Sequence, residues 1–141
     1  SNLIVRDGGV PGVVVKLGKS FADVAIDEAT SVVDCGAGAH GILVASAARD
    51  AGVAGLEFMR GIPGTVGGFV RMNGGAYDRE VSDVLIDCTV VMPGGQCSRC
   101  PSRTCNMPIA VGTGRCRGLP RPAHGRRAGE REAHQFPAQC R

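Results

Sequence analysis

The chain changes character after Gly95, and this change limits which residues can build a hydrophobic core. Residues 1–95 carry seven Lys and Arg against eleven Asp and Glu, and residues 96–141 carry nine Arg, no Lys, no Asp and two Glu, so the two parts have net charges of −4 and +7. Five of the seven cysteines and five of the eight prolines also lie beyond residue 95. A segment with one aromatic residue and few branched aliphatic residues buries too little apolar surface to offset the entropy of ordering it. We therefore expect a folded part over residues 1–94 and a largely disordered Arg/Cys/Pro-rich tail over residues 95–141.

The first part contains the periodic patterns of both strands and a helix. Alternating or β-branched apolar runs predict strands. Residues 41–52 place apolar and alanine positions opposite Ser46, Arg49 and Asp50, which predicts a helix that stops at Gly52. The predicted strands are Gly12–Leu17, Phe21–Asp27, Ser31–Asp34 and Val84–Val91, the second and third forming a hairpin. These patterns indicate a mixed α and β fold.

A Gly-x-Gly-x-x-Gly pattern lies at Gly36–Gly41, between a predicted strand and the predicted helix. Such a pattern occurs in dinucleotide-binding folds, where a second parallel strand ending in an acidic residue follows the helix. Here the helix leads into Gly55-Leu56-Glu57-Phe58 and a proline-glycine turn instead. The pattern is therefore interpreted as a tight strand-to-helix turn, with His40 as a capping or packing residue.

The segment Gly61–Tyr77, GIPGTVGGFVRMNGGAY, is the strongest functional signal. Two glycines inside a predicted helix, Gly67 and Gly68, each cost about 1 kcal/mol relative to alanine. Glycine at that cost is typical of sites where another group approaches the backbone closely. A helix beginning near Gly64–Thr65 would also direct its free amides outward, toward an anionic or electron-rich group. The segment therefore predicts a cofactor-binding loop.

At these residues the chain becomes recognisable. The stretch LEFMRGIPGTVGGFVRMNGGAYDREVSDV resembles the flavin-binding core of the UDP-N-acetylenolpyruvoylglucosamine reductases, also called UDP-N-acetylmuramate dehydrogenases. The resemblance runs from Ser1 to about Gly94, and the opening residues from Ser1 to Val5 are similar to a glycine-serine-asparagine loop of that family. It implies an α+β fold, an incomplete FAD-binding domain of the vanillyl-alcohol-oxidase type.

The resemblance also implies a chemistry. In the family, NADPH reduces bound FAD, and the reduced flavin passes a hydride to the enolpyruvyl double bond of a UDP-sugar, which gives UDP-N-acetylmuramate for peptidoglycan in the cytoplasm. The residues that would bind FAD are Ser1 and Asn2 at the diphosphate, Gly61, Ile62, Pro63, Gly64, Thr65, Val66 and Gly67 along the flavin, and Asn73, Gly75, Ala76 and Tyr77 on the adjoining wall. Asp78 stands where the family usually has glycine, so the conformation of that turn departs from the family pattern.

The catalytic residues of the family do not carry over. A tyrosine-arginine motif is expected after the strand Val84–Val91, and none follows Gly94. The family's proton-donating serine and late glutamate belong to a further domain. We therefore expect this chain to be a truncated and inactive form with no catalytic residue of its own, and its Lys-free tail to be an out-of-frame product.

Two other interpretations remain open. The chain could be the FAD-binding subunit of another flavin oxidoreductase, with the substrate domain supplied by a partner. A different class is a small zinc- or nucleic-acid-binding module that uses the tail arginines and the thiols of Cys97, Cys100, Cys105 and Cys116. The loose cysteine spacing and the lack of interleaved aromatic residues disfavour that class, so we expect no metal and no nucleic acid. With no apolar run long enough for a membrane helix, we expect no membrane segment either.

Overall fold

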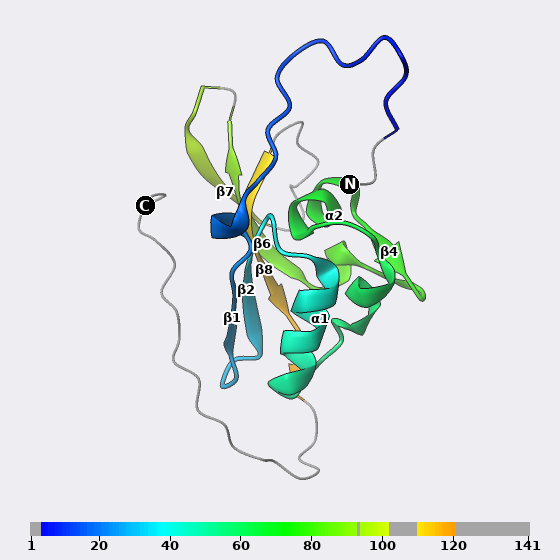
Figure 1. Ribbon diagram of the computed structural model, residues 1–141. Coiled ribbons are helices and arrows are strands. Elements are labelled where there is room, and N and C mark those ends of the chain that lie inside the picture. Colours follow the sequence, from blue (N-terminus) through cyan, green and yellow to red (C-terminus); the bar gives the residue numbers. More distant parts are fainter. Residues whose placement is uncertain (1–3, 93, 102–109, 121–141) are drawn as a thin grey trace.

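The computed structural model describes residues 4–92, 94–101 and 110–120 of the chain. Its centre is a five-stranded sheet with helices on one face (Figure 1). The strands follow the order β1-β2-β8-β6-β7, and every pairing within the sheet is antiparallel. Their bounds are β1 Val24–Asp27, β2 Val32–Gly36, β6 Leu85–Val91, β7 Cys97–Pro101 and β8 Ala110–Arg117. The fold is therefore α+β, as expected.

The predicted hairpin is present as β1 and β2. Asp27 ends β1, and its carboxylate accepts hydrogen bonds from the amides of Ala29 and Thr30 and from the Thr30 hydroxyl, at 3.0, 3.3 and 2.6 Å. This side chain satisfies backbone donors that the turn leaves without strand partners. These hydrogen bonds, that of the Thr30 hydroxyl first, lower the pKa of Asp27.

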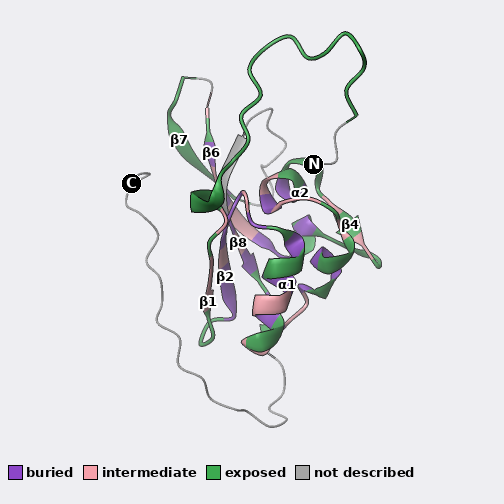
Figure 2. Cartoon of the chain, viewed as in Figure 1, coloured by how far each residue is buried: buried purple, intermediate pink, exposed green. Residues whose placement is uncertain are grey.

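The two α-helices cover one face of the sheet. Helix α1 spans Gly41–Asp50 and ends before Gly52, whose φ of +70° matches the predicted stop. The other helical elements are η1 Lys19–Phe21, η2 Glu57–Gly61, α2 Val66–Met72 and η3 Val81–Asp83. Buried residues concentrate between these elements and the sheet (Figure 2). The core includes Val33, Cys35, Val44, Leu56, Met59, Val66, Phe69, Val81, Cys88 and Cys116.

Two segments of the expected disordered tail, residues 97–101 and 110–120, contain strands of the structure. Strand β8 lies between β2 and β6, in the middle of the sheet, and β7 forms its edge. A short strand β9, Leu119–Pro120, pairs with β3, Val53–Ala54. Apolar periodicity did not reveal β8 because its core-facing positions include Gly114, where a Cβ atom would lie 3.4 Å from a methyl group of Val66. Residues 102–109 and 121–141 of the tail lie outside the described part.

Charged residues of the two halves meet on the sheet. The Arg99 guanidinium donates to Asp87 at 2.8 Å, and Arg115 lies 3.5 Å from Asp87 and 3.3 Å from Asp34. The cross-strand register places Asp34, Arg115 and Asp87 side by side on β2, β8 and β6. Two tail arginines thus neutralise acidic residues of the first half, where opposite charges on neighbouring strands stabilise the pairing.

The predicted strand Gly12–Leu17 is wrong. These residues have no regular secondary structure, and Val13, Val14 and Val15 are 91, 75 and 77% exposed. A strand needs a neighbour for its backbone hydrogen bonds. Among the described residues, no strand pairs with this segment.

Candidate functional site

The glycine-rich segment connects three elements. It starts at the end of η2 and forms the loop to α2, and it then enters a small hairpin of β4, Gly75–Ala76, and β5, Arg79–Glu80. A Cβ atom on Gly61 would lie 2.8 Å from the Tyr77 ring, so the first and last residues of the segment are in contact. The structure thus brings the two ends of the predicted cofactor-binding loop together. Ser1 and Asn2 lie outside the described residues.

The amides at the start of α2 point into the protein. The Val66 amide donates to the Ala39 carbonyl oxygen and the Gly67 amide to the Ala37 carbonyl oxygen, both at 2.9 Å. The expectation that this helix directs free amides outward is therefore wrong for these two residues. The first turn of α2 is thus hydrogen-bonded to the Gly36–Gly41 loop, because carbonyl oxygens of that loop accept the hydrogen bonds of these two amides.

The Gly36–Gly41 pattern is a tight turn, as interpreted from the sequence. A Cβ atom on Gly36 would collide with the Phe21 carbonyl oxygen, and one on Gly38 would lie 3.0 Å from the same atom. Gly41 faces the Met59 carbonyl oxygen in the same way. The glycines therefore permit close packing within the protein, and the strand after α1 is an antiparallel one.

His40 is the residue before α1. It is exposed, its side chain makes no capping hydrogen bond, and its backbone forms an isolated bridge with Thr65. The expected capping role is met by the main chain, because His40 is the N-cap residue of α1 and its carbonyl oxygen accepts hydrogen bonds from the Leu43 and Val44 amides at 2.9 and 3.2 Å. His40 contributes to the structure through its main chain, which links the two loops.

The glycines of the segment differ in what surrounds them. Gly67 packs on Ala37, at a distance of 3.0 Å between the two Cβ positions, and Gly64 has a φ of +129° that favours glycine. Gly68 is different, because it is exposed in the middle of α2 and has no atom within 4 Å of its Cβ position. No packing within the described residues requires glycine at position 68. Sequence reasoning noted this glycine only as a costly helical residue and did not include it among the site residues.

Asn73 has a structural role that the sequence did not reveal. It ends α2 with a φ of +47°, and the Gly74 amide returns to the Phe69 carbonyl oxygen at 2.8 Å, as in a Schellman motif. The Asn73 side-chain oxygen accepts a hydrogen bond from the Ser82 amide at 2.9 Å. Asn73 therefore fixes the path of the chain from α2 to η3.

Tyr77 and Asp78 form the turn of the small hairpin. Their φ values of +54° and +56° are those of a type I′ turn, and Ala76 pairs with Arg79 on either side of it. Asp is among the residues that adopt this backbone conformation more readily than most. The replacement of the family's glycine by Asp78 therefore keeps a left-handed turn.

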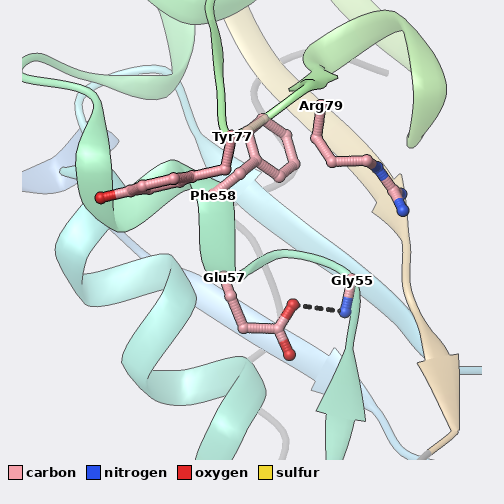
Figure 3. Close-up of a pocket in the computed structure, with 5 residues that line it drawn as sticks. All are labelled: Gly55, Glu57, Phe58, Tyr77 and Arg79. Carbon is pink, nitrogen blue, oxygen red and sulfur yellow. Dashed lines mark hydrogen bonds between the residues drawn. The ribbon is translucent and has the colours of Figure 1, made fainter.

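A surface pocket of about 270 Å³ lies beside Tyr77 (Figure 3). Its lining residues are Gly55, Glu57, Phe58, Tyr77 and Arg79, and Glu57 accepts a hydrogen bond from the Gly55 amide at 2.7 Å. Tyr77 is the only predicted cofactor residue among them. The pocket thus adjoins the glycine-rich segment without including Gly61–Gly67.

The described cysteines do not form the predicted alternative zinc site. Cys97 is exposed and Cys100 is buried on the same strand, and three strand residues span about 10 Å. Among the described residues, no group of three or more His, Cys, Asp and Glu side chains is arranged to hold a metal ion. Cys105 lies outside the described part. In the described part there is also no helix with the length and apolar character needed to cross a membrane.

Comparison with known proteins gives a consistent result. The chain is 76% identical over 95 residues to UDP-N-acetylenolpyruvoylglucosamine reductase of Erythrobacter litoralis, which is 67% of this chain and 29% of that protein. It is 73% identical over 97 residues to the reductase of the same name from Novosphingobium aromaticivorans, covering 68% of this chain and 32% of that protein. The chain thus spans about three tenths of the length of these curated relatives.

A solved structure is similar as well. UDP-N-acetylenolpyruvylglucosamine reductase (MurB) from Thermus caldophilus matches 81% of this chain and 44% of its own, with a TM-score of 0.68 and 30% identity. The FAD binding domain family matches residues 1–101, well over half of the chain. The resemblance found in the sequence is therefore confirmed, and the chain belongs to the FAD binding domain family.

Proposed function

We propose that this chain is the FAD-binding part of a UDP-N-acetylenolpyruvoylglucosamine reductase. The observation that carries the proposal is the 76% identity over 95 residues to a protein of that name. The exposed glycine of α2 adds a physical argument. A glycine that costs about 1 kcal/mol in a helix, and whose Cβ position has no atom within 4 Å beyond its own helix among the described residues, is suited to the close approach of a flat ring.

The residues proposed to hold FAD are those of the glycine-rich segment and its hairpin. Gly61, Ile62, Pro63, Gly64 and Thr65 form a loop whose side chains and backbone are partly exposed, and the open side of Gly68 continues that surface. Val66, Gly67 and Asn73 would act by holding this loop in place, because their polar groups bind the protein itself. Gly75, Ala76 and Tyr77 would form the adjoining wall, and Ser1 and Asn2 would contact the diphosphate.

When bound, FAD would supply the hydride chemistry, with NADPH as the reductant and the enolpyruvyl group of a UDP-sugar as the acceptor. The product, UDP-N-acetylmuramate, would serve peptidoglycan synthesis in the cytoplasm. Reduction of that double bond needs a positioned proton donor and stabilisation of developing negative charge. We propose that these 141 residues do not turn over the UDP-sugar by themselves.

Two assays test the proposal with the full 141-residue chain. Titration with FAD, followed by quenching of flavin fluorescence, should show saturable one-to-one binding. A second assay with NADPH and the enolpyruvyl UDP-sugar should show no oxidation of NADPH above the background without protein. Absence of FAD binding by a chain whose circular dichroism spectrum is that of a folded protein would contradict the first part. Turnover that follows protein concentration through further purification would contradict the second.

A further inference from the structure

Four buried cysteines lie in and beside one row across the central sheet. The register places Cys35, Gly114, Cys88 and Cys100 opposite one another on β2, β8, β6 and β7. Residues that lie directly opposite in antiparallel strands point to the same face. Cys116, two residues from Gly114 on β8, points to that face as well. The row is therefore a line of thiols in the core.

The positions within the row are not equivalent. Cys88 and Cys100 are directly opposite each other, and both are buried, with 1% and 4% of their surface exposed. Directly opposed residues of an antiparallel pair have Cα atoms about 4.5–5.5 Å apart, which lies within the range of about 4.4–6.8 Å that a disulfide spans. Cys35 and Cys116 are diagonal instead, because Cys35 is opposite Gly114 and Cys116 is opposite Val33. Diagonal neighbours are about 7–8 Å apart, beyond that range.

The reactivity of the thiols also favours the Cys88–Cys100 pair over the Cys35–Cys116 pair. The Cys35 thiol donates to the Gly114 carbonyl oxygen at 3.3 Å. Its pKa is raised well above the ordinary value by its hydrogen bond with Cys116 and by burial, so its thiolate is disfavoured. Cys100 lies on the edge strand β7, whose other residues are exposed. Local opening of an edge strand costs less than global unfolding and would bring Cys100 and Cys88 into contact with solvent.

We propose that Cys88 and Cys100 are a redox-sensitive pair that forms a disulfide between β6 and β7 by exchange with a small-molecule disulfide. The Cys100 thiol loses a proton, its thiolate attacks one sulfur of the small disulfide, and one small thiolate leaves. The Cys88 thiolate then attacks the Cys100 sulfur of this mixed disulfide, and the second small thiolate leaves. The two cysteines are oxidised, one small disulfide is reduced to two thiols, and the bridge fastens the edge strand to the sheet.

The test uses the full chain and glutathione disulfide as the probe. The reduced protein is incubated with the probe, the remaining thiols are alkylated, and the protein is digested with trypsin without reduction. Residues 80–99 and 100–103 are expected as one joined pair of peptides, with fragment ions that locate the bridge at Cys88. Dithiothreitol should separate them. The bridged form should also unfold at a temperature higher by on the order of 5 °C, because the bridge restricts the unfolded chain.

Cys97 supplies the matched control, since it lies in the same peptide as Cys88 but is exposed on the other face of β7. The joined peptides should persist in Cys97→Ala and disappear in Cys88→Ala. Circular dichroism in reducing buffer checks that both variants fold, and fragment ions of the unmodified chain locate the bridge without any variant. A bridge at Cys97, a bridge between Cys35 and Cys116, or complete alkylation of Cys88 and Cys100 after incubation would each overturn the proposal.

Discussion

The amide of Gly67 donates a hydrogen bond to the carbonyl oxygen of Ala37 at 2.9 Å, and the Cβ position of Gly67 lies 3.0 Å from the Ala37 Cβ atom. This contact joins the glycine-rich segment to the Gly36–Gly41 turn, the two glycine patterns of the sequence. It explains glycine at position 67 by packing within the protein. Gly68, the next residue, has no such neighbour. The two adjacent glycines therefore provide matched tests of folding and of cofactor binding.

Gly67→Ala should destabilise the folded chain. The added methyl group would press on Ala37, which is fully buried and carries the acceptor of the Gly67 hydrogen bond. We expect the free energy of unfolding to fall by about 1–3 kcal/mol, as for other overpacked sites. Urea denaturation followed by circular dichroism measures this free energy. An unchanged denaturation midpoint would show that α2 shifts to accept the methyl group without loss of stability.

Gly68→Ala should have the opposite effect on stability. Alanine at this exposed helix position raises the free energy of unfolding by up to about 1 kcal/mol, because it restricts the unfolded chain. FAD affinity should nevertheless fall at least about tenfold, which corresponds to about 1.4 kcal/mol of binding free energy. The reason is that the added methyl group would occupy the open side of α2. Flavin fluorescence titration of this variant beside Gly67→Ala measures the difference. Equal affinity in Gly68→Ala and the unmodified chain would remove Gly68 from the cofactor surface.

Removal of residues 96–141 should abolish cooperative unfolding. The deletion removes β8, so β2 and β6 lose the strand that pairs with both of them, and core residues such as Val33 and Cys88 become exposed. A chain that ends at Arg121 keeps every described strand and is the matched control. Thermal denaturation followed by circular dichroism compares the two. A cooperative transition at the control's midpoint in residues 1–95 would show that the first part folds without β8.

Arg115→Gln should cost about 1 kcal/mol, because it removes the cation beside Asp34 and the partly buried Asp87. The loss should shrink in 1 M salt, where the Debye length is about 3 Å. Arg49→Gln is the control, since Arg49 and Asp50 form an exposed pair on α1 and should contribute little. Equal losses in the two variants would mean that the position of Arg115 within the sheet has no importance.

Asp27 should titrate below its ordinary value of 3.8. Its folded-state pKa is lowered, so its contribution to stability is complete above about pH 5 and is lost as the pH falls through the folded-state pKa. Thr30→Val removes the largest cause and should return the Asp27 pKa toward 3.8, whereas Thr89→Val should leave it unchanged. Carbon-detected NMR titration of the carboxylates gives both values, and an unshifted midpoint in the unmodified chain would contradict the turn geometry.

Local patterns predicted much of the first part. The hairpin of β1 and β2, the helix ending before Gly52 and the strand near Val84–Val91 follow from side-chain period and turn chemistry, which act between near neighbours. The glycine-rich segment also identified the family, because its residue order is specific enough to be recognised. The strand at Gly12–Leu17 was wrong since β-branched residues favour a strand only where a partner is present.

The sequence by itself determined the helix and hairpin positions, the glycine-rich segment and the charge difference between the halves. Only the tertiary structure decided what those features contact. It placed β8 at the sheet centre, although Gly114 and Cys116 give no apolar pattern, because small core-facing residues there make room for α2. It also bound the Val66 and Gly67 amides to the carbonyl oxygens of Ala39 and Ala37, 27 and 30 residues earlier in the chain, which left Gly68 as the open glycine. Contacts between residues distant in the chain depend on which surfaces pack together. A local sequence pattern predicts a helix or a strand but not the segment against which it packs.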